Sequence, residues 1–251
     1  MGEVDLNFRP DVPVIDANIA LGRRHNRRVK VDTLEGTLKA MAHVGVGRAL
    51  AYSPHAATFD SRDGNDLLIE TIAGDERILP QFVCNPSYDD MDAFASYVKE
   101  HGGRAVRMIP PLHRYPFVDW IVGDWLDWLT GEGLPLLLSI EEVDPVAIYS
   151  TLEKHPDLAV VLCEVKYSDA TWALPLLRQL QNLHMEISRF VGSGGVDKLM
   201  TTVGDQRFLF GSRFPDSQMG AQLYNLHRCG LSTESLTAIC AGNLERLLGL
   251  G

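Results

Sequence analysis

The sequence predicts an α/β protein whose residues 1–251 form a single (β/α)8 TIM barrel. Eight short runs rich in leucine, valine and isoleucine alternate with stretches of helical hydrophobic spacing. The runs begin 24 to 34 residues apart, which leaves room for one strand, one helix and two short loops in each interval. An open, doubly wound sheet is the main alternative. The barrel is favoured because no Gly-x-Gly-x-x-Gly or Gly-Lys-Ser/Thr phosphate loop follows any run.

The predicted strands are short and largely apolar. They begin at Val12, Val46, Ile78, Arg104, Leu134, Leu158, Leu183 and Phe208. The runs Leu134–Leu138 and Leu158–Leu162 contain no polar side chain, which is typical of parallel strands buried on both faces. In a barrel, the functional site is built from residues that follow the carboxyl ends of these strands.

The segments between the runs carry helix signals. After the first run, Asp32 and Glu35 have the spacing of a capping box, and Gly45 marks the expected helix end. The last helix is expected to run from a cap at residue 232 or 233 to Gly249. Its leucine-rich stripe has the three-and-four spacing of a helix that packs against a barrel.

Composition narrows the classes of partner. The formal net charge of −10 argues against a nucleic acid or an anionic membrane, since both favour a surplus of Lys and Arg on one face. The basic run Arg23–Lys30 is the local exception, and it predicts either a solvated loop or an anion-steering rim. The four cysteines lack zinc-type spacing, and no apolar run has the length of a membrane span. We expect no signal peptide, since residues 1–10 contain no apolar run. A cytoplasmic protein is expected.

Polar and ionic side chains follow the predicted strands, without a histidine cluster. In strand order they are Asp16 and Asn18; Ser53 and His55; Asn85; Arg107 and His113; Ser139 and Glu141; Glu164 and Lys166; Ser188 and Arg189; and Arg213 and Asp216. Because the carboxyl ends of the strands converge at one end of a barrel, these residues are the candidates for a site.

Over nearly its whole length the chain resembles the amidohydrolase-related family of metal-dependent hydrolases, which also includes decarboxylases and lactonases. The strongest motifs are Arg207–Pro215 and Gly242–Leu250. Three further segments are similar to family motifs: Val14–Gly22, Arg104–Pro111 and Gly194–Leu199. The resemblance implies the barrel fold and a hydrolase- or decarboxylase-like activity.

The chain departs from the family at the positions that would hold the metal. The family pattern places His-x-His after the first strand, where this chain has Asn18 and Ala20. It places His after the fifth and sixth strands and Asp after the eighth, where this chain has Ser139, Glu164 and Arg213. A catalytic zinc site needs about three His, Cys or carboxylate ligands, and an arginine repels a dication. We therefore expect neither a metal nor another cofactor.

Two functional classes remain open. In the first, the protein is a metal-independent enzyme that acts on a small carboxylate-bearing substrate. Glu164 and Arg213 are then the catalytic candidates; the substrate-binding candidates are Asn18, Arg107, Ser139, His55 and His113. In the second, the barrel is a non-catalytic pseudoenzyme that binds a ligand or stabilises a partner subunit. A homodimer is the default assembly, and an intact paralogue is the other expected partner.

Glu164 and Arg213 have exchanged charge relative to the family pattern. We predict that they form an ion pair across the barrel mouth, because a buried charge is costly unless it is paired. If the site is only structural, Arg107 is expected to pair with a carboxylate such as Asp16 or Glu141.

Overall fold

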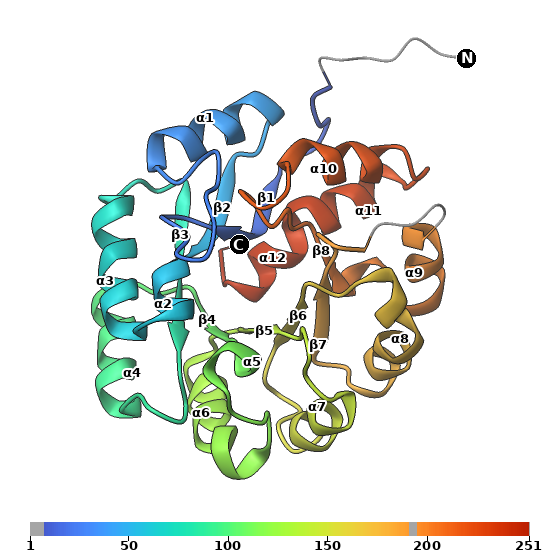
Figure 1. Ribbon diagram of the computed structural model, residues 1–251. Coiled ribbons are helices and arrows are strands. Elements are labelled where there is room, and N and C mark those ends of the chain that lie inside the picture. Colours follow the sequence, from blue (N-terminus) through green and yellow to red (C-terminus); the bar gives the residue numbers. More distant parts are fainter. Residues whose placement is uncertain (1–7, 191–194, 251) are drawn as a thin grey trace.

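Eight parallel strands form the centre of the molecule, and their spatial order is their order in the chain. The computed structural model describes residues 8–190 and 195–250, and it confirms the predicted (β/α)8 barrel (Figure 1). The strands are β1 (Ile15–Ala20), β2 (Arg48–Tyr52), β3 (Ile78–Cys84), β4 (Ala105–Met108), β5 (Leu136–Ser139), β6 (Val160–Cys163), β7 (Leu183–Glu186) and β8 (Phe208–Leu209). The family-like segment Gly194–Leu199 begins outside the described residues.

The barrel closes where β1 meets the segment that follows β8. The backbone N–H of Ala17 donates to the carbonyl of Phe210 at 2.9 Å. Farther along, the N–H of Arg213 donates to Asn18 and that of Ala20 to Phe214, both at 2.8 Å. Backbone pairing therefore continues past the end of β8, and it places Arg213 beside the end of β1.

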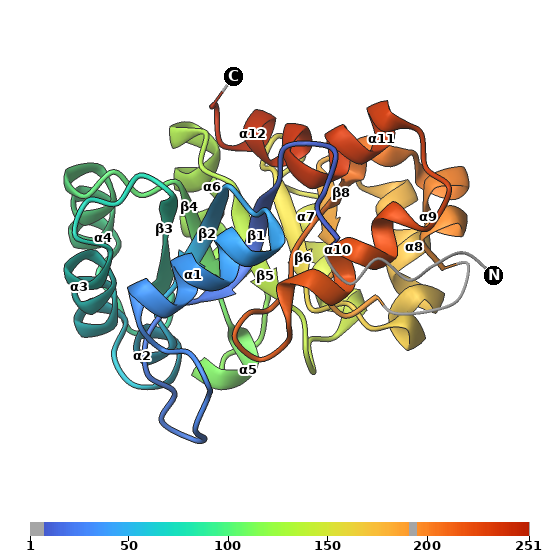
Figure 2. The ribbon, with the colours of Figure 1, turned by 90° about the horizontal axis from the view of Figure 1, so that it is seen from above.

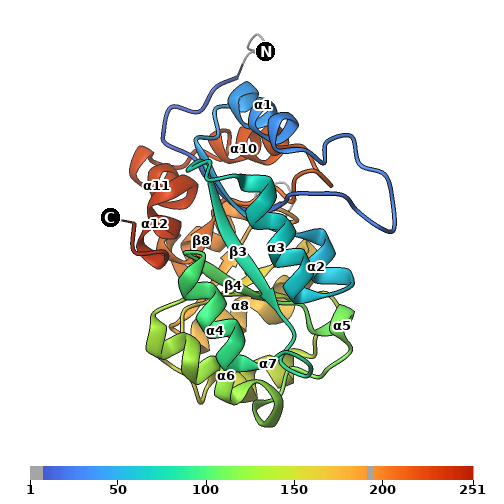
Figure 3. The ribbon, with the colours of Figure 1, turned by 90° about the vertical axis from the view of Figure 1, so that its left-hand side faces the viewer.

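Helices surround the barrel (Figure 1). They are α1 (Leu34–Val44), α2 (Pro54–Thr58), α3 (Ser61–Ile72), α4 (Met91–Glu100), α5 (Pro110–His113), α6 (Asp119–Glu132), α7 (Pro145–Leu152), α8 (Ala170–Gln179), α9 (Gly195–Val203), α10 (Met219–His227), α11 (Thr233–Thr237) and α12 (Asn243–Leu247). Seen from the side, α3 and α4 lie across β3 and β4 (Figure 3). No helix among the described residues is both long and apolar enough to cross a bilayer.

Two helix predictions need adjustment. The cap of α1 is Thr33, whose hydroxyl accepts from the N–H of Gly36, and not Asp32. The predicted end is confirmed at Gly45, where a φ of 81° suits glycine. The last helical segment starts at the predicted Ser232 cap but contains a π-helical turn, Ala238–Gly242, between α11 and α12.

The two ends of the barrel differ. At the amino-terminal ends of the strands, Leu244 and Leu248 from the C-terminal segment pack against inward-facing residues such as Leu50 and Leu137. The opposite end carries α2, α5 and the long segment between β1 and α1, which projects from the barrel (Figure 2). The helix α12 therefore closes one end, and the loops at the other end surround the candidate site.

Candidate functional site

The guanidinium group of Arg107 occupies the interior of the barrel near the carboxyl ends of the strands. Arg107 is the third residue of β4 and is fully buried. Its Nε and Nη2 atoms donate to the hydroxyl of Ser139 at 3.1 and 2.8 Å, and Nη2 also donates to Glu164 at 3.3 Å. Its Nη1 atom donates to the side-chain carbonyls of Asn18 at 2.9 Å and Gln81 at 3.3 Å.

Protein groups saturate this guanidinium. An arginine side chain has five N–H donors, and the contacts with β1, β3, β5 and the end of β6 number five. The ring of Tyr52 on β2 lies against the guanidinium, with its centroid 4.2 Å from Cζ. Arg107 is therefore fixed by its neighbours and has no donor left for a ligand.

Glu186 on β7 is a second buried charged residue. Asn18 links it to Arg107, so the two charges and their hydrogen-bond partners form one network. The Oε1 atom of Glu186 accepts from Asn18 Nδ2 at 3.1 Å, from the backbone N–H of Glu164 at 2.5 Å and from the hydroxyl of Ser188 at 2.8 Å. Its Oε2 atom accepts from the backbone N–H of Ser188 at 2.7 Å. Burial raises the pKa of Glu186, and these donors oppose the rise. A side chain at position 211 would displace this carboxylate, because a Cβ there would lie 2.5 Å from Oε2.

Asp16 lies beneath the network on β1 and is fully buried. Its Oδ1 atom accepts from the backbone N–H groups of Asn18 and Ser212, both at 3.0 Å. Its Oδ2 atom has no hydrogen-bond partner among the described residues. Burial raises the pKa of Asp16 to about 7, because desolvation outweighs the two donors. The carboxyl group can therefore change its protonation state near neutral pH.

The rim of the mouth is built around Arg213. The predicted ion pair is confirmed: Arg213 Nε lies 3.6 Å from Glu164 Oε1. The separation exceeds hydrogen-bond distance, and this Nε has no hydrogen-bond acceptor in the described part of the chain. The side chain is 21% exposed. Glu164 and Arg213 both have left-handed backbone conformations, with φ of 70° and 58°, which are uncommon outside glycine.

Asp216 anchors further arginines at the rim. Its carboxylate is 2.5 Å from Arg24 and 2.6 Å from Arg27, and a third contact reaches Arg213 at 3.8 Å. A cavity of about 600 Å³ lies within the segment that contains these two loop arginines. The basic run is therefore part of the rim, although Arg27 keeps half of its side chain exposed.

The structure brings most of the predicted site residues together at the mouth. They are Asn18, Arg107, Ser139, Glu164 and Arg213. The suggestion that Arg107 pairs with Asp16 or Glu141 is wrong. Its carboxylate partner is Glu164, whereas Glu141 contacts Lys166 at 3.0 Å and Arg189 at 3.3 Å.

The two predicted histidines have no contact with this network. His55 lies on α2, and its Nδ1 atom is 3.0 Å from Nε2 of His25 on the projecting loop. The ring of His55 stacks on Phe59. His113 lies at the end of α5, where burial lowers its pKa. Among the described residues, no hydrogen bond or ion pair joins either histidine to Arg107 or Glu164.

Three members of the network were not predicted: Tyr52, Gln81 and Glu186. Each lies within a strand, whereas the predicted positions were sought mainly beyond the apolar runs. Strand alternation could have found them, since side chains two residues apart share one face. Gln81 follows the inward-facing Leu79 by two positions, as Arg107 follows Ala105.

No group of three or more His, Cys, Asp or Glu side chains among the described residues is arranged to hold a metal ion. At the metal positions of the family pattern, Asn18 and Ser139 are engaged with Arg107. Glu164 lies between the guanidinium groups of Arg107 and Arg213. The charges at the mouth therefore compensate one another through direct protein contacts.

Comparisons with known proteins agree with the fold. An uncharacterized TIM-barrel protein from Bordetella bronchiseptica superposes with a TM-score of 0.78 at 15% identity, covering 95% of this chain and 99% of that one. A dihydroxybenzoic acid decarboxylase from Polaromonas sp. JS666, with bound manganese and the inhibitor 2-nitroresorcinol, gives 0.76 at 12% identity over 95% and 97%. The 5-carboxyvanillate decarboxylase from Sphingomonas paucimobilis superposes with a TM-score of 0.70 at 14% identity, covering 95% of this chain and 99% of that one.

The structural similarities are too remote in sequence to show more than the fold. No curated protein has significant sequence similarity to the chain. The amidohydrolase family model, in contrast, matches residues 7–250. Because this match covers nearly the whole sequence and agrees with the barrel, the chain belongs to the amidohydrolase family.

Proposed function

We propose that the mouth of this barrel binds a small carboxylate-bearing ligand without a metal ion, and that Arg213 provides the anion contact. One contrast carries the proposal: Arg107 is saturated by protein groups, whereas Arg213 is partly exposed and loosely paired. A guanidinium with spare donors is suited to a bidentate contact with a carboxylate. Arg24 and Arg27 add positive charge nearby, and Asp216 balances only part of it.

The residues at the mouth do not fit a divalent metal. Of the positions that hold ligands in the family pattern, only Glu164 carries a carboxylate, and it is 3.3 Å from Arg107 and 3.6 Å from Arg213. A dication at this carboxylate would be close to two fixed positive charges, and repulsion is strong where water is excluded. We therefore assign no step to a bound metal.

A second candidate function is acid–base catalysis at the same mouth. The observation in its favour is the position of Glu164, whose side chain is 14% exposed and whose carboxylate adjoins Arg213. A substrate carboxylate on Arg213 would then place its neighbouring atoms near a group that can accept or donate a proton. Glu164→Gln is expected to abolish turnover of such a substrate while preserving its binding, and unchanged turnover would exclude this role.

The test of the binding proposal uses 2,6-dihydroxybenzoate, because a 2,6-dihydroxybenzoate decarboxylase of the same fold, with a TM-score of 0.71 at 12% identity, forms a complex with it. We expect calorimetry to detect binding to protein treated with a chelator. Arg213→Met should weaken this binding by about tenfold or more, because a charge-assisted contact is lost. Arg62→Met, which removes an exposed arginine on α3, should leave it unchanged. Binding only after addition of manganese or zinc would contradict the proposal.

Association with a second copy or with an intact paralogue stays a prediction, and so does the cytoplasmic location.

A further inference from the structure

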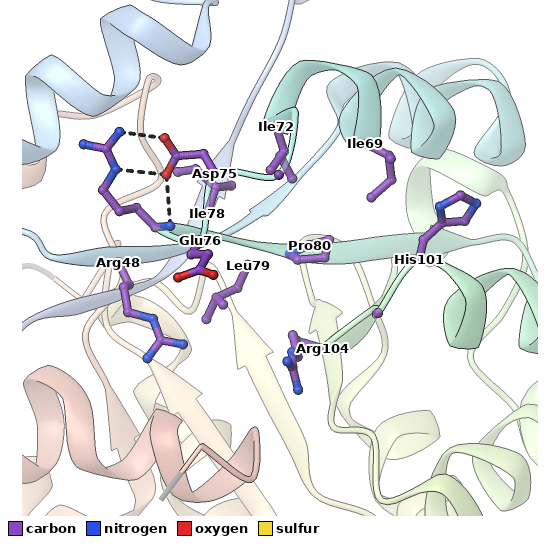
Figure 4. A pocket seen from close by; sticks show the side chains of 13 residues that line it. Arg48, Ile69, Ile72, Asp75, Glu76, Ile78, Leu79, Pro80, His101 and Arg104 are labelled. Carbon is purple, nitrogen blue, oxygen red and sulfur yellow. Dashed lines mark hydrogen bonds and ion pairs between the residues drawn. The ribbon is translucent and has the colours of Figure 1, made fainter.

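A second cavity lies at the amino-terminal end of the barrel, opposite the mouth. Its volume is about 750 Å³, within the range of small-molecule sites. The wall contains apolar side chains from the end of α3 and the start of β3, namely Ile69, Ile72, Ile78, Leu79 and Pro80 (Figure 4).

Three arginines line this cavity because three adjacent strands begin with, or directly after, an arginine. Arg48 is the first residue of β2, and Arg77 and Arg104 directly precede β3 and β4. Backbone bonds hold them at one edge of the sheet: the N–H of Ala49 donates to Arg77 at 2.8 Å, and that of Arg104 to Pro80 at 3.0 Å. The parallel register thus concentrates positive charge at one place on a chain whose net charge is −10.

Within residues 8–190 and 195–250, only Arg77 of these three arginines has a close carboxylate partner. Arg77 donates from Nε and Nη2 to the carboxylate of Asp75, at 2.9 and 2.6 Å. The side chains of Arg48 and Arg104 make no hydrogen bond or ion pair within the described chain, and they extend toward the same side of the cavity (Figure 4). Glu76 is the other carboxylate of the lining, so three arginines and two acids leave an excess of one positive charge.

Arg207, at the same end of the barrel, shows the contacts that a structural arginine makes. Arg207 precedes β8 and donates to the backbone carbonyls of Leu177, Leu180 and Leu183. Those bonds connect β8 to the neighbouring α8 and β7 segments. Arg48 and Arg104 make no such contacts, so packing of the barrel does not account for their charge.

We propose that this cavity binds a small amphipathic monocarboxylate. Arg48 and Arg104 hold its carboxylate, and the apolar wall covers its hydrocarbon part. The single excess positive charge matches one carboxylate, and guanidinium groups without protein partners keep their donors for it. An apolar body gains free energy by leaving water against the isoleucine and proline side chains. This site is separate from the mouth and does not depend on the function proposed for Arg213.

The experiment is a fluorine NMR titration of the intact protein with 4-fluorobenzoate. We expect the bound signal to show an affinity that is weaker by about tenfold or more in Arg48→Gln/Arg104→Gln. The control is Arg62→Gln, which removes an exposed arginine outside the cavity lining and should change the affinity less than about threefold. The neutral analogue 4-fluorobenzamide should not bind at this site. Circular dichroism and the thermal midpoint of the double variant check that the fold is retained.

The outcomes separate this site from the mouth. A signal lost in Arg213→Met but kept in the double variant belongs to the mouth and overturns the proposal for this cavity. Equal binding of the amide also overturns it, because recognition would then not require a charge. Loss in the double variant with retention in Arg213→Met supports it, whatever the mouth binds.

Discussion

Arg107 and Arg213 lie at the same end of the barrel but in opposite surroundings. Arg107 is fully buried, makes five hydrogen bonds and lies against the ring of Tyr52. Arg213 is 21% exposed, and its nearest carboxylate atoms are 3.6 and 3.8 Å away. The difference shows that charge alone does not identify a binding residue. The residue available to a ligand is the one whose donors the protein leaves unused.

We call Arg107 and its hydrogen-bond partners the centre. This centre is expected to contribute to the stability of the fold more than to ligand binding. A charge in the barrel interior loses its hydration, and only close partners compensate for that loss. Asn18 connects the two buried charges, since its Oδ1 atom accepts from Arg107 and its Nδ2 atom donates to Glu186. Removal of one charge would leave the other without part of its compensation.

The largest expected effect follows from Arg107→Met. Methionine keeps the apolar volume of the side chain but leaves Glu164 and Glu186 without the buried cation. We expect the free energy of unfolding to fall by about 3 to 5 kcal/mol, the usual cost of breaking a buried charge pair. Urea denaturation of both proteins at neutral pH measures the difference.

Arg213→Met is the matched variant for this comparison. Its ion pairs are long and partly exposed, so we expect a loss of about 1 kcal/mol or less. If both variants lose equal stability, it is wrong to assign Arg107 a structural role and Arg213 a role in ligand binding.

The fold was predictable because the relevant signals are local. Apolar runs and their spacing depend on residues near one another in the chain, and each of the eight runs overlaps or adjoins an observed strand. The π-helical turn at Ala238–Gly242 was not predictable in this way, because the leucine stripe continues through it with ordinary helical spacing.

The site was predictable only in part, because its contacts join distant strands. The Glu164–Arg213 pair followed from two charge changes at strand ends. The partner of Arg107 was not predicted correctly, since at least five carboxylates lie within strands or near strand ends and the sequence does not rank their distances. Glu186 was missed because it is the last residue of β7, whereas the candidates were sought beyond the apolar run, at Ser188 and Arg189.

An intermediate effect concerns Asp16 beneath the centre. Its pKa rises from 3.8 to about 7 in the folded protein, so the folded state binds the proton more tightly. This contribution to stability is complete below about pH 4 and is lost as the pH rises toward 7. Relative to Asp16→Asn, the wild type should lose about 2 kcal/mol between about pH 5 and pH 7, because the slope is about 1.4 kcal/mol per pH unit near pH 5 and about half of that at pH 7.

Denaturation of wild type and Asp16→Asn at several pH values measures this change. Asp75→Asn is the control, because the Arg77 side chain lowers the pKa of Asp75 to about 2 and its contribution is constant above about pH 5. Parallel stability curves for the wild type and Asp16→Asn would show that Asp16 is ionised in the folded protein throughout this range.

The smallest expected effect tests how far the rim extends. Arg27 contacts Asp216 at 2.6 Å but is half exposed, so solvent and salt screen its charge. We expect Arg27→Gln to weaken 2,6-dihydroxybenzoate binding by less than about fivefold. Raising sodium chloride from about 50 to about 300 mM should weaken binding to the wild type, and it should weaken binding to the variant by a smaller factor. If Arg27→Gln instead lowers the affinity as much as Arg213→Met does, the projecting loop contacts the ligand. The binding region would then include the whole basic segment and not Arg213 alone.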